Sequence, residues 1–182
     1  WNHLFSEKLF SNTTVTFSEY LFDVNMQEDY TYESFNDEFE FLYYSGIRDW
    51  GVKMDFDYLP NPNHYVKFGL SDTYHTFYPG QMELRFVQPE FNESIDTSFV
   101  FSDRLYSHDA YVYLEDDIKF NDRFKANIGL HASLFRVGDK NYTSLQPRFS
   151  ARYLIDENWS TKISYAEMQQ NIHLLTNSNA GL

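Results

Sequence analysis

The stretch at residues 145–173, LQPRFSARYLIDENWSTKISYAEMQQNIH, decides the fold. It holds two runs whose side chains alternate with a period of two, as in a half-buried β-strand. The apolar positions share one face, at Phe149, Ala151, Tyr153, Ile155, Trp159, Thr161, Ile163 and Tyr165. Residues 156–158 predict a tight turn between the strands. The other face carries Arg148, Arg152 and Lys162, where a soluble core would need aliphatic side chains, so the pattern favours an apolar outside over a wet inside.

The same alternation recurs upstream and predicts strands near residues 1–5, 12–26, 39–58 (broken near Gly46), 66–77, 111–120 and 124–134. One face is predicted to point to lipid, through Val52, Met54, Phe56, Val66, Phe68, Val112, Leu114, Ile128, Leu130 and Ile163. The other is predicted to face a lumen, through Lys53, Asp55, Asp57, Lys67, Glu115, Asp117, Lys125, Arg148, Arg152 and Lys162. Asp116 is a misfit on the apolar face. After Glu19 the apolar positions change phase, which indicates either a bulge or passage from a buried to a wet zone.

The predicted connections alternate in length. They are short at 6–8, 60–63, 121–123 and 156–158, long at 27–36 and 78–107, and intermediate at 137–142. The longest, 78–107, could hold short strands at 84–87 and 98–101. Outer-membrane barrels have short periplasmic turns and longer outside loops. The acidic, aromatic long loops are therefore predicted to contact substrate, a sugar by stacking or a cationic ligand, with candidates Tyr30, Tyr32, Phe35, Tyr78, Phe91 and Phe99.

Apolar side chains flank every short turn: Phe5 and Phe10, Tyr58 and Tyr65, Phe120 and Phe124, Ile155 and Trp159. Aromatic rings beside the turns are typical of the aromatic girdle of a membrane barrel, which lies at the membrane interface. The hairpin ends of a soluble β-sandwich also pair aromatics across strands. We interpret the flanks as a girdle.

The composition permits a membrane barrel. The 182 residues are 20% aromatic, yet the mean hydropathy is negative. No run of about 18 apolar residues occurs, whereas a transmembrane strand needs only about 9–11 residues with one apolar face. The net charge of −13 argues against a nucleic-acid partner, which would require clustered Lys and Arg. Zero cysteines exclude disulfides and thiolate chemistry. No signal peptide is visible, and we expect the chain to be a piece of a longer one.

Residues that could carry chemistry are few. None of the six histidines has metal-ligand spacing. Residues 115–117 could bind a hard cation, and Asp55 with Asp57 could form an acid–base pair, but we interpret both groups as lumen lining. No nucleotide-binding or hydrolase motif occurs. The sequence therefore predicts no enzyme, no cofactor and no metal site.

Four blocks of the chain resemble the barrel region of TonB-dependent outer-membrane receptors of the Bacteroidetes type. They are QPRFSARYLIDENWSTKISYAEMQQNIHLL at 146–175, GIRDWGVKMDFDYLPNPNHYVKFG at 46–69, AYVYLEDDIKFNDRFKANIGLHASLF at 110–135 and WNHLFSEKLFSNTT at 1–14. The resemblance covers most of the chain and implies transport across the bacterial outer membrane. It implies as partners outer-membrane lipid, the rest of the barrel with its plug, the TonB complex through an N-terminal part absent here, and in some systems a substrate-binding surface lipoprotein.

The combined expectation is an all-β protein, with antiparallel up-and-down strands of a transmembrane outer-membrane β-barrel. Residues 1–182 form a single segment, about seven or eight of a larger set of strands, without the plug. Its function would be TonB-dependent import of a glycan, siderophore, vitamin or peptide. The alternative is a secreted soluble β-sandwich that recognises glycan through exposed aromatics.

Overall fold

The computed structural model describes residues 1–31, 36–88, 93–100 and 103–172. Within these ranges the regular structure consists of strands: β1 (Asn2–Ser6), β2 (Leu9–Thr31), β3 (Asn36–Asn61), β4 (His64–Gln88), β5 (Glu93–Val100), β6 (Leu105–Lys119), β7 (Phe124–Val137), β8 (Lys140–Leu154) and β9 (Ser160–Ala166). Among the described residues no helix is long and apolar enough to span a membrane.

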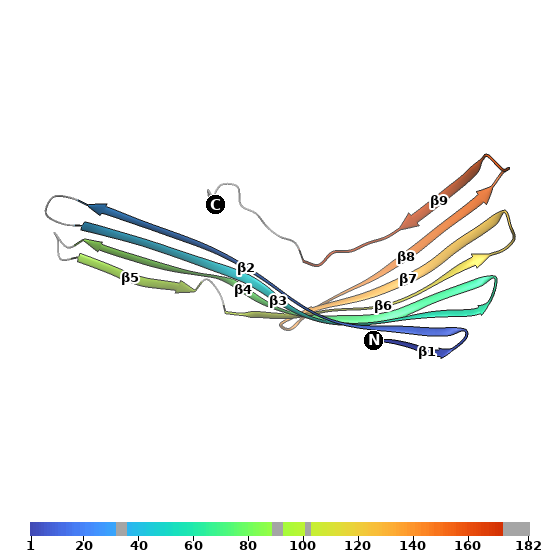
Figure 1. Cartoon of the computed structure of the whole chain (residues 1–182), viewed down its shortest axis with the longest axis horizontal. Helices are drawn as coiled ribbons and strands as arrows, with labels where there is room; N and C mark the ends of the chain where they lie inside the picture. Colours follow the sequence, from blue (N-terminus) through green and yellow to red (C-terminus); the bar gives the residue numbers. More distant parts are fainter. Residues whose placement is uncertain (32–35, 89–92, 101–102, 173–182) are drawn as a thin grey trace.

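All of the strands belong to one antiparallel sheet with the order β1-β2-β3-β4-β6-β7-β8-β9, and β5 pairs with β4 beside this path. Each strand on the path lies next to its neighbours in sequence, which confirms the predicted up-and-down arrangement. In the described part of the chain, β1 and β9 each pair with one strand only, so the sheet is open. Figure 1 shows the sheet bending near its middle, with the turns β1–β2, β3–β4, β6–β7 and β8–β9 together at one end.

Three of these turns are held by side chains that cap their own backbone. The Asp156 carboxylate Oδ1 accepts hydrogen bonds from the backbone N–H groups of Asn158 and Trp159, both at 2.8 Å. The Asn61 and Asn121 side-chain oxygens accept equivalent bonds in the β3–β4 and β6–β7 turns. Asn and Asp favour turns because they can make this local bond. The tight turn predicted at 156–158 is confirmed.

The strands beyond these turns are longer than predicted. The loop expected at 27–36 is wrong, because β2 continues to Thr31 and β3 begins at Asn36, while residues 32–35 lie outside the described ranges. The connection expected at 78–107 is largely strand, because β4 extends to Gln88 and β5 pairs back along it. The short strands expected within it at 84–87 and 98–101 are confirmed over their described residues, as parts of these longer strands. The polar and acidic side chains of these two segments indicated loops. Such side chains do not prevent strand pairing, because a sheet can face water.

β3 is not broken near Gly46, which corrects the prediction. Its pairing with β4 shifts there instead: Gly46 lies opposite Tyr78 and Tyr44 lies opposite Gln81, so β4 carries one extra residue. Gly80 takes a φ of 133° within this bulge, a conformation that L side chains rarely adopt. The β2–β3 pairing runs without a shift from Leu9 to Thr31, so the change of phase after Glu19 is no bulge in that pairing.

The connection expected at 137–142 is a two-residue turn, because β7 ends at Val137 and β8 begins at Lys140. Gly138 has a φ of 55° there, which suits a tight hairpin. This turn ends the β7–β8 hairpin opposite Ser107 of β6, well below the far ends of β2, β3 and β4.

The sheet is a single layer without a conventional core. The buried apolar side chains of the described residues are Ala126 and Phe135, and the buried polar ones are Ser11, His75, Ser107 and Gln146. Many large apolar side chains are exposed, among them Val112, Leu114 and Ile163. A soluble domain would bury such a surface against a second layer, so this sheet requires an apolar environment on one side.

Candidate functional site

Strand register sorts the side chains into two faces. Phe56, Phe68, Leu114 and Leu130 form one continuous row across β3, β4, β6 and β7. The Phe56 and Phe68 rings stack at 4.9 Å. All of the residues predicted to face lipid lie on the side of this row, here named the apolar face: Val52, Met54, Phe56, Val66, Phe68, Val112, Leu114, Ile128, Leu130 and Ile163.

The apolar face has a defined height. On β3 its side chains run from Trp50 to Tyr58, a span that matches the roughly 9–11 residues of a transmembrane strand. The next outward position toward the far end is Arg48, whose guanidinium lies 2.5 Å from the Glu19 carboxylate on β2. On β3 this ion pair marks the end of the apolar run, and on β4 the same face becomes polar at Asp72, which lies opposite Val52 and pairs with His108 at 2.9 Å.

The girdle prediction is wrong for Phe10 and Tyr65, because strand register places both on the face opposite the apolar face. Phe10 lies beside Asp57, and the Tyr65 hydroxyl donates a hydrogen bond to the Asp57 carboxylate at 2.6 Å. Phe120 and Phe124 stack at 5.1 Å beside the β6–β7 turn. An aromatic beside a turn therefore does not by itself specify the face.

Asp116 does lie on the apolar face, as the alternation predicts. Its neighbours across the strands are Val66 and Ile128. The carboxylate Oδ2 lies 2.7 Å from Nδ1 of His64, at the short-turn end of the sheet. The partner compensates for the polar group, which explains how an acid is tolerated among apolar neighbours.

The polar face lies opposite. The structure places on it every residue predicted to face a lumen: Lys53, Asp55, Asp57, Lys67, Glu115, Asp117, Lys125, Arg148, Arg152 and Lys162. Asp57, Lys67 and Glu115 are direct cross-strand neighbours, and the Lys67 ammonium lies 4.0 Å from the Glu115 carboxylate. The Lys67 ammonium also lies 4.8 Å from the centre of the Tyr65 ring. Lys67 is thus paired with Glu115 and lies over the Tyr65 ring.

Asp55 is held from two sides. The Tyr113 hydroxyl donates to its Oδ1 at 2.7 Å, and the Lys53 ammonium lies 3.0 Å from its Oδ2. Tyr113 reaches Asp55 across Gly69, where an added Cβ would lie 2.7 Å from the tyrosine ring. Since Asp55 and Asp57 each accept a hydrogen bond from a different tyrosine, they do not form a shared acid–base pair.

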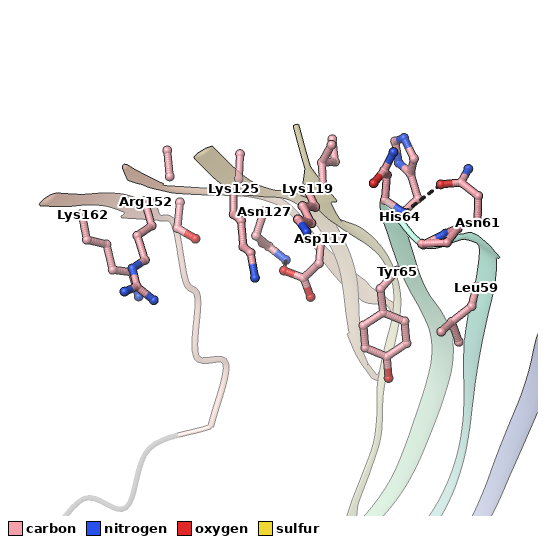
Figure 2. Close-up of a pocket in the computed structure, with 16 residues that line it drawn as sticks. Leu59, Asn61, His64, Tyr65, Asp117, Lys119, Lys125, Asn127, Arg152 and Lys162 are labelled. Atoms are coloured by element: carbon pink, nitrogen blue, oxygen red, sulfur yellow. Dashed lines mark hydrogen bonds between the residues drawn. The ribbon is translucent and has the colours of Figure 1, made fainter. Parts of the chain in front are cut away.

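Four cations, here named the basic row, are direct cross-strand neighbours on the polar face: Lys119, Lys125, Arg152 and Lys162. They line a cavity of about 490 Å³ near the short turns, and Figure 2 shows them beside Asp117, Asn127 and Tyr65. Lys119 pairs with Asp122 at 2.7 Å, which lowers the pKa of that carboxyl in the solvent-exposed turn. In the described ranges no ion pair reaches Lys125, Arg152 or Lys162. Like charges directly opposite one another destabilise a sheet, so an anionic group bound at this row would stabilise it.

A second polar row was missed by sequence reasoning. Asp49, His75 and Ser107 lie opposite one another on β3, β4 and β6, and Asp49 Oδ1 lies 2.7 Å from His75 Nδ1. Ser107 is only 1% exposed, and its hydroxyl has no hydrogen-bond partner among the described residues. Ser107 and His75 therefore lack the hydrogen bond that would join a nucleophile to its base. Its members come from three strands, so no sequence motif could have joined them.

Of the predicted substrate residues, the described ones lie on three different strands. Tyr30, Tyr78 and Phe99 lie on β2, β4 and β5, whereas Tyr32, Phe35 and Phe91 lie outside the described residues. The Tyr78 ring has the Arg48 and Arg104 guanidinium groups at 5.9 and 5.0 Å from its centre. Across the described ranges no group of three or more His, Cys, Asp and Glu side chains could hold a metal ion.

An open antiparallel meander, with an apolar band of membrane height on one face and charges on the other, defines part of the wall of a transmembrane β-barrel. The comparison with known families makes this specific. A family model described as TonB dependent receptor-like, beta-barrel matches residues 2–174, and the chain belongs to that family. The family consists of transporters rather than enzymes, and its members are typically outer-membrane proteins. No curated protein matches the chain.

Proposed function

We propose that this chain is part of a TonB-dependent outer-membrane transporter that binds a nutrient and imports it with energy coupled from the inner membrane. The observation that supports it most directly is the two-faced sheet: lipid would contact the apolar face, and the polar face would line a wet lumen. Residues 1–182 would be one segment of the barrel domain. The two unpaired edges support this, because backbone groups left unpaired in hydrocarbon cost several kcal/mol each.

The basic row supports a partner inside the lumen. Lys125, Arg152 and Lys162 converge without an ion pair in the described ranges, and an acidic surface of a plug domain would supply the missing charge. Coupling to the TonB complex would run through the N-terminal part of the same protein. The Bacteroidetes type, with an optional surface lipoprotein, belongs to this proposal through the resemblance of the four sequence blocks.

The soluble β-sandwich is the less favoured function. A sandwich requires a second sheet packed on the apolar face, and the described strands form one layer. Glycan remains among the candidate cargoes, together with siderophores, vitamins and peptides.

Neighbouring residues on β4 test the two faces. The chain has no cysteine, so single-cysteine variants Phe68→Cys and Lys67→Cys of the full-length protein can carry spin labels without background from this segment. In native outer membranes, the label at 68 should be relaxed by oxygen dissolved in lipid and the label at 67 by a water-soluble nickel complex. Equal water accessibility at both positions contradicts the barrel proposal.

Transport is tested in cells. Strains with and without the full-length gene are given labelled oligosaccharides, siderophores, vitamins and peptides, and periplasmic accumulation is measured. Accumulation of one cargo class should require the gene and should disappear when an uncoupler dissipates the proton gradient. Gene-dependent accumulation that the uncoupler leaves unchanged contradicts energy coupling.

A further inference from the structure

The polarity of the sheet inverts beyond the Arg48–Glu19 ion pair. The strands continue past it as a four-stranded extension, here named the arm: residues 21–31 of β2, 36–46 of β3, 81–88 of β4, and β5 (Figure 1). Because the β2–β3 pairing has no shift, even-numbered residues of β2 stay on one side along its whole length. Below the ion pair this side carries Asn12 and Thr14, and above it carries Phe22, Val24 and Met26.

The side of the arm that continues the polar face is therefore apolar over most of its length. We name it the inner arm face, and its apolar residues are Phe22, Val24, Met26, Phe39, Phe41, Tyr43, Met82, Leu84, Phe86, Ile95 and Phe99. Toward the tip of the arm the same side also carries Glu28, Tyr30, Asp37 and Glu93. The extra residue of β4 in its bulge at Gly80 brings Met82, Leu84 and Phe86 onto this face. Phe99 is 50% exposed and Ile95 is 52% exposed. Within the described ranges no second layer covers this face.

The opposite side, the outer arm face, is acidic. It carries the exposed acids Asp23, Asp29, Glu38, Glu40, Glu83 and Asp96. Arg85 is the one Lys or Arg on this side in the described part of the arm. Alternation along each arm strand thus sets an apolar position beside an acidic one.

The arm also has an open edge. β5 pairs with β4 and with no other described strand. The next hairpin cannot cover it, because the β7–β8 turn ends opposite Ser107, below the start of the arm. Natural edge strands are usually protected by charged side chains, above all Lys, by Pro or by a bulge. β5, ESIDTSFV, has the acids Glu93 and Asp96 but neither Lys nor Pro, and it presents Ile95, Thr97 and Phe99 on one face. An edge of this kind is a template for an added strand.

We propose that the arm binds a peptide cargo in extended conformation, added as a further strand beside β5. Its apolar side chains would continue the inner arm face, and alternate basic side chains would meet the outer arm face. This inference rests on the proposed transport function, and it names the cargo class. A glycan is the competing cargo, because Glu28, Tyr30, Asp37 and Glu93 near the tip of the inner arm face could bind its hydroxyl groups, and the experiments below distinguish it from a peptide.

Binding to the purified full-length receptor in detergent tests the proposal without transport. The probe is a fluorescent octapeptide of alternating Val and Lys, and the control has the same composition with the Val residues in one block. Fluorescence polarisation should show saturable binding of the alternating peptide and binding weaker by about tenfold or more for the block peptide. Equal affinities overturn the proposal.

Backbone methylation distinguishes strand addition from side-chain binding. Two versions of the probe carry N-methyl groups on alternate residues, in opposite phases. Only one edge of an added strand pairs with β5, so methylation should abolish binding in one phase and leave it in the other. Loss in both phases, or in neither, contradicts addition at this edge.

Matched variants on β5 locate the site. Ile95→Gln changes the inner arm face, and Val100→Gln changes an exposed apolar residue on the other face of the same strand. The first should weaken binding by about tenfold and the second should leave it unchanged. Equal effects of the two variants, or displacement of the probe by an uncharged oligosaccharide, overturn the assignment.

Uptake of the same probe separates this inference from the proposed function. Binding that discriminates the peptides, without uncoupler-sensitive accumulation in cells, supports the peptide site and contradicts import. Absence of discriminating binding, with energy-dependent import of another cargo, contradicts the peptide site and leaves the transport function supported.

Discussion

At the residue scale, the two faces of the sheet differ in which substitutions they tolerate. Leu70 and Ser71 are neighbours on β4 at mid-height of the apolar band, Leu70 on the apolar face and Ser71 on the polar face. Leu70→Arg should destabilise the full-length protein by about 2–4 kcal/mol, because it exposes a charge to the centre of the bilayer. Ser71→Arg, as the matched control, should be milder. Urea titration in lipid vesicles measures both, and equal costs contradict the orientation of the sheet.

Gly69 has no room for a side chain because the Tyr113 ring of the neighbouring strand β6 lies over it. A Cβ at this position would lie 2.5 Å from the Met54 carbonyl oxygen and 2.7 Å from the Tyr113 ring, which crosses Gly69 to reach Asp55. Gly69→Ala should therefore destabilise by about 1–3 kcal/mol through overpacking. The measurement is the temperature at which the folded band disappears in semi-native electrophoresis. Ser150→Ala on the same face serves as control, and an unchanged temperature for Gly69→Ala contradicts the prediction.

At the element scale, the bulge in β4 lies where the apolar side chains of the sheet change sides, at the start of the arm. Gly80 has a φ of 133°, and an added Cβ would lie 3.0 Å from the Tyr43 hydroxyl. Gly80→Val should strain this junction by about 1–3 kcal/mol. We expect limited proteolysis to cleave the arm faster while the heat-resistant folded band remains. Ser98→Ala in β5 is the control, and an arm of unchanged protease resistance contradicts the prediction.

The strand faces could be predicted from the sequence, whereas the strand ends in the arm could not. Between Trp50 and Tyr58 apolar and polar residues alternate strictly on β3, so the period of two is clean. Beyond Arg48 polar and acidic residues are frequent, and residues such as Asp29 and Glu38 resemble a loop although they pair directly. Contacts between distant strands, such as Tyr113 with Asp55, leave no local signal in the sequence.

At the scale of the whole molecule, one sheet presents its apolar side chains on opposite sides in two parts. In the band they lie on the apolar face, and in the arm they lie on the side that continues the polar face. The change of phase after Glu19 is no bulge in the β2–β3 pairing, and passage into a wet zone stays a prediction. The sheet remains a single layer throughout, so its stability depends on what contacts each face rather than on a core of its own.

The last prediction is that the 182-residue chain, produced in isolation, does not form a stable membrane pore. The main path of the sheet ends at β1 and β9, and unpaired backbone groups at both edges would cost several kcal/mol each in hydrocarbon. Closure into a small barrel of about eight strands leaves a lumen that side chains just fill. The polar face would then crowd Lys, Arg, Asp and Glu side chains that suit a wide, wet interior.

We therefore expect the isolated chain to need the remaining strands of its barrel or to associate with further copies through its edges. Refolding into detergent and into lipid, followed by light scattering and conductance recording, measures the oligomeric state and any pore. The full-length protein, treated in the same way, is the control for the refolding conditions. A monodisperse, heat-resistant monomer with the conductance of a closed barrel contradicts the prediction, because it would require β1 and β9 to pair and the basic row to be accommodated inside a narrow lumen.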